Sequence, residues 1–286
     1  MIRKLSVIRA AAASVILMSA AACGGDREAA SYSVSFPMQK ILLERIAGRD
    51  EAVNTLIPQG ADPETYEPSV STLRSLDGSR AFFSLGTPGF EKSVVERVKG
   101  NSALSIVDCS QGINLISGTH SQGQPDPHIW SSVRNARVIA DNMGKWLAKN
   151  NPGEAAAIAS RLNELQKDLV AIDDSIARIL APARGVSFVV MHPILSYFAR
   201  DYGLNQIAME TEGKEASPRQ LSVRMKEAAS SGAGIMIHDA GHSDSQAKAV
   251  ASQLGLKLVV VNLNGDKLEE SLLRIAREIA SSVKDR

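Results

Sequence analysis

The chain has 286 residues, of which 44% are hydrophobic and 22% charged, a composition typical of a folded globular protein and unlike that of a disordered or collagen-like chain. Its 32 basic and 31 acidic residues give a formal net charge of +1 at pH 7. This balance provides no general electrostatic reason to bind nucleic acid, so no nucleic-acid partner is predicted.

Residues 1–22 have the pattern of an export signal and are predicted to be cleaved from the mature protein. Arg3, Lys4 and Arg9 precede an uninterrupted run of small and apolar residues that ends at Ala22. The run is too short to cross a bilayer as a mature helix but fits the core of a signal peptide. The mature chain is therefore expected outside the cytoplasmic membrane.

Cys23 follows three alanines, and this junction resembles a bacterial lipobox, in which the cysteine becomes the lipid-bearing first residue. The resemblance implies lipidation at Cys23, a lipidated linker over 23–30 and a membrane-anchored protein of the cell envelope, on its periplasmic side or at the cell surface. The alternative is a plain signal peptide with Cys23 incidental. The other cysteine, Cys109, ends an apolar run and is predicted to lie in the core without a disulfide partner.

Residues 31–150 alternate short apolar runs with amphipathic segments, which is the rhythm of a parallel α/β lobe. A helix is predicted over 133–150, directly after the segment Asp126 to Trp130. The predicted strands are Tyr32–Phe36, Ala52–Ile57, Ala81–Leu85 and Ser105–Asp108.

Residues 151–182 predict one long connecting helix that begins at Pro152 and ends before Pro182. At 1.5 Å per residue such a helix is about 40 Å long, more than the width of one lobe. Its heptad-like spacing leaves two interpretations, a helix packed along both lobes of one chain or a coiled-coil dimer, and the flanking α/β rhythm favours the first. The apolar positions are Ile158, Leu162, Leu165, Leu169, Ile172, Ile176 and Ile179.

Residues 183–286 repeat the α/β rhythm and predict a second lobe. Ser217 before Pro218 predicts a capped helix start, and Ser243 with Gln246 predicts a capping box. The predicted fold class is therefore α/β, with two lobes that each contain a mostly parallel sheet flanked by helices. The predicted strands of this lobe are Val186–Met191, Gln206–Ala208, Ile235–His238 and Lys257–Val261.

Three of the five histidines occupy positions that suit a ligand cleft. His192 directly follows a predicted strand, His238 ends one, and His128 precedes a predicted helix. The carboxyl ends of parallel strands face the ligand crevice, and imidazole together with carboxylates such as Glu64 or Asp239 suits zinc and related transition metals. Metal binding and a cleft for an organic ligand both remain open at this point.

The sequence contains no G-x-S-x-G, H-E-x-x-H, P-loop or G-x-G-x-x-G signature. A thiol nucleophile at Cys109 has no histidine partner marked nearby, and a buried structural cysteine explains that position as well. No enzymatic activity is predicted.

Several segments in order resemble the bacterial zinc and manganese ABC-transporter substrate-binding proteins of cluster A-I type. Residues 58–68, Pro-Gln-Gly-Ala-Asp-Pro-Glu-Thr-Tyr-Glu-Pro, are similar to that family's G-x-D-P-H-T-Y-E-P, and residues 126–130 read D-P-H-I-W. Residues 192–203 match H-P-x-x-x-Y-F-A-x-x-Y-G, and residues 213–217 resemble a G-K-E-P-S segment of one branch. The resemblance implies two α/β lobes joined by one long backbone helix.

Carried over by position, the resemblance implies that His128 and His192 are metal ligands. Glu64 stands where the family has its first ligand histidine, and Asn262 stands where a ligand aspartate is common. Glu64 can still ligate through a carboxylate oxygen, with His238 or Asp239 as the fourth donor. The alternative is a degenerate site with weak or no metal binding. His120, in a shortened loop, and His242 are interpreted as surface residues.

The resemblance implies a monomeric extracytoplasmic solute-binding component of a metal-uptake transporter. Its transported ligand would be a divalent transition metal, Zn²⁺ first and Mn²⁺ as the alternative, and its partners a cognate ABC permease and ATPase. Cys23 would anchor it to the membrane through a lipid. Two other functions remain open, a surface adhesin or structural lipoprotein without metal transport and a hydrolase that uses the same cleft.

Overall fold

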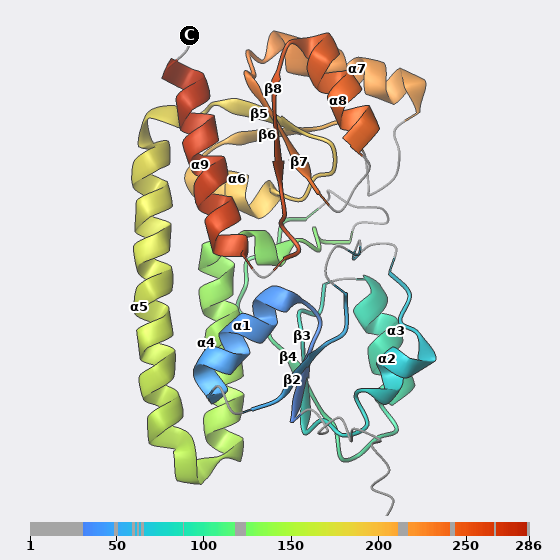
Figure 1. Cartoon of the computed structure of the whole chain (residues 1–286), viewed down its shortest axis with the longest axis vertical. Helices are drawn as coiled ribbons and strands as arrows, with labels where there is room; N and C mark the ends of the chain where they lie inside the picture. The colour runs from blue at the N-terminus through green and yellow to red at the C-terminus, as the bar shows by residue number, and fades with distance from the viewer. Residues whose placement is uncertain are drawn as a thin grey trace, which may run out of the picture.

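The computed structural model describes residues 31–48, 51–58, 61, 63, 66–87, 89–117, 124–210, 217–240, 244–265 and 267–284. Within these ranges the strands form two separate four-stranded parallel sheets, one from each half of the chain (Figure 1), which confirms the predicted α/β fold. No helix in the described ranges is both long and apolar enough to cross a membrane. The predictions for Cys23, Glu64, His120, His242 and Ser243 concern positions outside these ranges.

The first sheet has the strand order β2-β1-β3-β4, with every neighbouring pair parallel. Its strands are β1 (Tyr32–Val34), β2 (Val53–Thr55), β3 (Ala81–Ser84) and β4 (Ser105–Asp108). β1 is shorter than predicted because Gln39 accepts hydrogen bonds from the backbone N–H groups of Ser35 and Phe36, which turns the chain into a helix. The helices that follow are α1 (Pro37–Ala47), α2 (Val70–Arg74), α3 (Gly89–Val98) and α4 (Val133–Asn150).

The second sheet has the order β6-β5-β7-β8 and is also parallel throughout. Its strands are β5 (Ser187–Val190), β6 (Asn205–Ala208), β7 (Ile235–Asp239) and β8 (Lys257–Val261). Its helices are α6 (Ser196–Tyr202), α7 (Pro218–Ser230), α8 (Asp244–Leu254) and α9 (Leu268–Lys284). Ser217 caps α7 in a capping box with Gln220, as the serine before Pro218 predicts.

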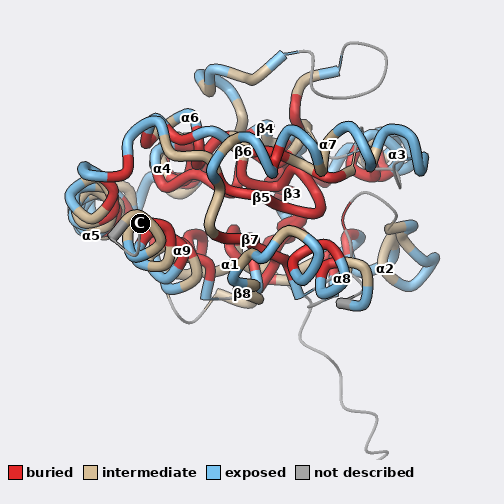
Figure 2. The backbone as a smooth tube through the Cα atoms, turned by 90° about the horizontal axis from the view of Figure 1, so that it is seen from above, coloured by how far each residue is buried: buried red, intermediate tan, exposed pale blue. Residues whose placement is uncertain are grey.

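The long helix α5 (Ala155–Leu180) runs beside both sheets (Figure 1). It packs against α1 and α4 of the first half and against α9 of the second, which confirms the interpretation of a helix that joins two lobes of one chain. Ile158, Leu165, Leu169 and Ile176 of the predicted stripe are buried, and the other stripe residues are half-buried. Figure 2 shows the buried backbone concentrated in the sheets, with exposed residues along the outer sides of the helices.

Gly144 explains how closely α4 and α5 approach each other. A Cβ atom at this position would lie 2.6 Å from Leu162 Cδ2, well inside van der Waals contact. A glycine inside a helix costs about 1 kcal/mol relative to alanine. Here the missing side chain makes room for the α5 leucine, so the two helices pack without a gap.

Helix α6 belongs to the second half but hydrogen-bonds to the first. The Tyr197 hydroxyl donates to the carbonyl of Asp126 at 2.7 Å, and Arg200 Nη1 donates to the carbonyl of Asn114 at 2.6 Å. Tyr202 donates to Asp173 of α5 at 2.8 Å. The Tyr197 bond connects the segment that follows His192 directly to the segment that carries His128.

Candidate metal centre

His128 lies in the loop that leads into α4 and is 1% exposed. The neighbouring Asp126, which is fully buried, accepts through Oδ1 from the His128 backbone N–H at 2.9 Å and pairs with His128 Nδ1 at 2.8 Å. Burial acts to raise the pKa of Asp126, but the hydrogen bonds and charge of His128 outweigh burial and lower it. Asp126 is therefore an ionised carboxylate that orients the imidazole.

His192 lies just beyond β5, which ends at Val190, one residue earlier than predicted, and it is 5% exposed. Its Nδ1 lies 3.1 Å from Oε2 of Glu210, which follows β6. The backbone N–H of Glu210 donates to the carbonyl of Met191 at 2.9 Å, so the parallel pairing of β5 and β6 places this carboxylate beside the ring. His192 thus has the same kind of carboxylate partner as His128.

The two imidazoles face each other across the two halves of the chain. His128 Nε2 and His192 Nε2 are 2.9 Å apart, with ring centroids 4.8 Å apart and planes at 81°. Since a carboxylate only accepts, each Nδ1 donates to its carboxylate, and when both rings are neutral, as metal binding requires, each Nε2 presents a lone pair to the other. Two lone pairs at this separation repel each other, and either a shared proton or a metal cation between the two nitrogens would remove the repulsion.

His238 and Asp239, the other candidate donors, occupy the last two positions of β7 and are buried. Asp239 accepts from the backbone N–H of Leu263 at 2.7 Å and from the side-chain amide of Asn264 at 3.2 Å. This carboxylate therefore also supports the turn between β8 and α9. In the part of the chain that the structure describes, no group of three or more His, Cys, Asp and Glu side chains is arranged to hold a metal ion.

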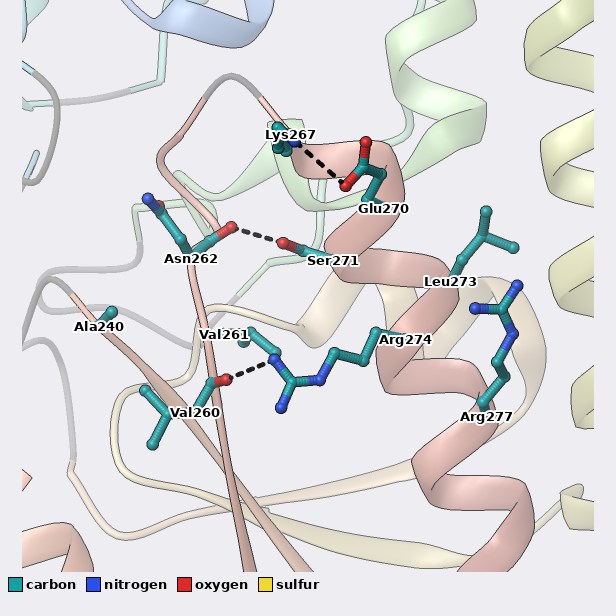
Figure 3. A pocket seen from close by; sticks show the side chains of 10 residues that line it. All are labelled: Ala240, Val260, Val261, Asn262, Lys267, Glu270, Ser271, Leu273, Arg274 and Arg277. Atoms are coloured by element: carbon teal, nitrogen blue, oxygen red, sulfur yellow. Dashed lines mark hydrogen bonds and ion pairs between the residues drawn. The ribbon is translucent and has the colours of Figure 1, made fainter.

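Asn262, which replaces the expected aspartate, lines a hollow of about 730 Å³ between β8 and α9 (Figure 3). Ser271 and Arg274 of α9 donate to the carbonyls of Asn262 and Val260, so the helix occupies acceptors along the edge strand. None of His128, His192 and His238 lines this hollow. Because it lacks these histidines, the hollow is not the candidate metal site despite its size. The candidate site is the pair of imidazoles.

Asp126 and Glu210 are residues of this centre that the sequence pattern does not single out. The spacing of Asp126 and His128 in the sequence could have indicated this contact, because a carboxylate two residues before a histidine can reach the histidine ring. Glu210 follows a strand predicted in the same parallel sheet as the strand before His192. The order of those strands in the sheet was needed to place the two side chains together.

Two parallel α/β units joined by a long helix, with carboxylate-oriented histidines where they meet, define the class of two-lobed substrate-binding proteins. The chain belongs to the family described as zinc-uptake complex component A, periplasmic, which matches residues 33–285. This confirms the family resemblance. Family members are binding proteins of transport systems, not enzymes, in agreement with the missing enzyme signatures.

Curated relatives include proteins named for two different metals. The chain is 26% identical over 249 residues to the zinc-binding protein AdcA of Streptococcus pyogenes, covering 76% of this chain and 47% of that protein. It is 27% identical over 221 residues to the manganese-binding lipoprotein MntA of Halalkalibacterium halodurans, covering 73% of this chain and 72% of that one. The chain therefore spans about half the length of the AdcA relatives.

Solved structures share the fold over nearly the whole described chain. The crystal structure of ZnuA matches with a TM-score of 0.82 and 29% identity, covering 89% of this chain and 99% of that chain. FpvC from Pseudomonas aeruginosa in complex with Mn²⁺ matches with a TM-score of 0.79 at 18% identity, covering 90% of this chain and 99% of that chain, and shows the fold alone.

Proposed function

We propose that this protein captures a divalent transition metal ion, zinc first, outside the cytoplasmic membrane and delivers it to an ABC permease driven by an ATPase. The observation that carries the proposal is the 2.9 Å approach of His128 Nε2 and His192 Nε2. A tetrahedral ion with bonds of 2.0–2.1 Å needs its two nitrogens about 3.3 Å apart. A separation of the rings by roughly 0.4 Å would satisfy this geometry.

Two further donors complete a four-coordinate site in this proposal. Glu64 supplies the third as a carboxylate oxygen, and His238 or Asp239 supplies the fourth. Replacement of a ligand histidine by Glu64 adds a negative charge, while Asn262 removes the charge of an aspartate. With His238 as the fourth donor the net charge of the donor set is then unchanged, whereas Asp239 in that place adds one further negative charge.

The choice between zinc and manganese depends on coordination geometry and metal supply, because both ions accept mixed nitrogen and oxygen ligands. The relatives named for zinc and for manganese have nearly equal identity to this chain. Imidazole-rich sites suit zinc, and the pair of histidines is the basis for placing zinc first. In the same proposal, a lipid on Cys23 keeps the protein close to its permease.

Metal content after purification without an affinity tag, followed by calorimetry with zinc and manganese, tests the proposal. We expect one bound ion per chain and a loss of affinity of about 100-fold or more in His128→Ala and in His192→Ala. Glu64→Ala should weaken binding strongly, and Glu64→His should restore it and favour zinc.

Glu67→Ala is the matched control for Glu64, because Glu67 is an exposed carboxylate of the same segment. It should bind like the parent. A parent protein that binds neither metal would reject the proposed function. Equal affinities across the Glu64 variants would instead reject Glu64 as a ligand and leave the two histidines with His238.

A further inference from the structure

Glu91, in the first turn of α3, is a carboxylate that is only 1% exposed and belongs to no part of the proposed metal site. Its Oε1 accepts from the backbone N–H of Leu85 at 2.9 Å and from the Ser35 hydroxyl, and its Oε2 accepts from the backbone N–H of Gly86 at 2.6 Å. Burying a charged group is costly, and apolar packing alone would not select one here. The three donors indicate that this side chain holds the loop after β3.

That loop reaches the segment of His128. Thr87 follows the two residues held by Glu91, and its hydroxyl donates to the carbonyl of Pro127 at 2.8 Å. Pro127 directly precedes His128. The backbone turns tightly before this contact, since Gly86 has φ of +71° and a Cβ there would lie 2.9 Å from Asp108 Oδ1. The position of Thr87 therefore depends on the hydrogen bonds by which Glu91 holds Leu85 and Gly86.

A second, aromatic connection joins the same turn of α3 to the histidine. The ring of Phe90 lies 6.2 Å from that of Phe36, and Phe36 lies 4.3 Å from Trp130. Trp130 in turn lies 5.1 Å from the His128 imidazole. Glu91 and Phe90, neighbours in one helical turn, thus reach His128 through a hydrogen-bonded loop and through a series of mostly edge-to-face ring contacts.

We propose that Glu91 is a positioning residue for metal capture, which holds the loop over 85–87 and, through Thr87 and Pro127, sets the His128 imidazole for the ion. The inference rests on the proposed function, because it assumes that His128 binds metal. Under this inference Glu91, which does not touch the ion, is one of the residues that determine the metal affinity. Glu91 acts through the backbone before His128, whereas Asp126 acts on the ring itself.

The protonation of Glu91 determines the pH of the test. Burial raises the pKa of Glu91 to about 7; the hydrogen bonds from Leu85, Ser35 and Gly86 lower it, and the charge of Asp108 raises it. Above this pH the carboxylate is mostly ionised and accepts from all three donors. At pH 8 the variants are therefore compared with a parent protein in which the ionised Glu91 holds the loop over 85–87.

The experiment measures zinc affinity by chelator competition at pH 8, and thermal unfolding without metal, for four variants and a control. Glu91→Gln keeps the size of the side chain but turns an N–H donor toward the loop, and Thr87→Val keeps the shape but removes the hydroxyl. We expect each to weaken zinc binding about threefold to tenfold, less than the 10–100-fold typical of groups that touch a metal ligand. The double variant should bind like the single ones, because both act on one connection.

Thr87→Ser keeps the hydroxyl and should bind within about twofold of the parent. Glu269→Gln is the matched control, a half-buried carboxylate in the first turn of α9 whose pKa is also raised by burial, and it should leave affinity unchanged. Lower thermal stability with unchanged zinc affinity in Glu91→Gln and Thr87→Val would overturn the inference and leave the proposed function intact. Additive losses in the double variant would overturn the route through Thr87. A parent that binds no zinc would reject both proposals.

Discussion

Asp126→Asn removes the negative charge behind His128 while it preserves the shape of the side chain. Asp126 is fully buried and serves two donors, the backbone N–H and Nδ1 of His128, so water cannot replace it. A hydrogen bond to a charged group contributes about 1.5–3 kcal/mol and a neutral one about 0.5–1.5 kcal/mol. The difference of roughly 1.4 kcal/mol corresponds to about tenfold in affinity.

Glu210→Gln provides the internal comparison, because it makes the same change behind the other histidine. Its bond to His192 is longer, at 3.1 Å, and its side chain is 16% exposed, so solvent screens part of its charge. We expect a loss of only about threefold. Zinc affinity by chelator competition at pH 7.5 compares the two variants with the parent, and unfolding without metal verifies that both are folded.

Both variants exchange a carboxylate for an amide beside a histidine Nδ1, but Asp126 is fully buried and also accepts from the backbone N–H of His128, whereas Glu210 is partly exposed. An Asp126→Asn protein that binds zinc within twofold of the parent would refute the argument that the carboxylate orients a ligand. A larger loss in Glu210→Gln than in Asp126→Asn would refute the argument from burial.

Two further predictions concern pH and the long helix. Metal binds neutral imidazole, and histidine ordinarily titrates near pH 6.5, so zinc affinity should be full above that range and fall as the pH drops through it; competition titrations from pH 5 to 8 that show constant affinity would contradict an imidazole site. Leu165 of α5 is fully buried, so Leu165→Ala should lower the free energy of unfolding by about 2–5 kcal/mol in urea titrations, while a loss below 1 kcal/mol would show that this position is not in the core.

The alternation of strands and helices, the long connecting helix and the positions of His128 and His192 close to element ends were predictable from the amino-acid sequence alone. Two strands, Ser105–Asp108 and Lys257–Val261, and the helix over 133–150 have the predicted bounds. These features depend on local hydrophobic periodicity, proline and capping residues, which the sequence displays directly. The predicted strand over 81–85 ends one residue early, because the backbone N–H of Leu85 donates to the Glu91 carboxylate instead of to a neighbouring strand.

The contacts between polar groups from distant segments required the three-dimensional structure, even for the two histidines that the family resemblance had paired. His128 and His192 are 64 positions apart in the chain, and their facing nitrogens follow from the packing of two sheets across α5 and from the bonds of α6 to the first half. The pairing of Glu210 with His192 requires the order of strands in a sheet, and the burial of Glu91 requires a neighbouring strand end and loop. Periodicity reports which residues are buried, but the direction of a side chain between distant segments is set by packing, which no local pattern contains.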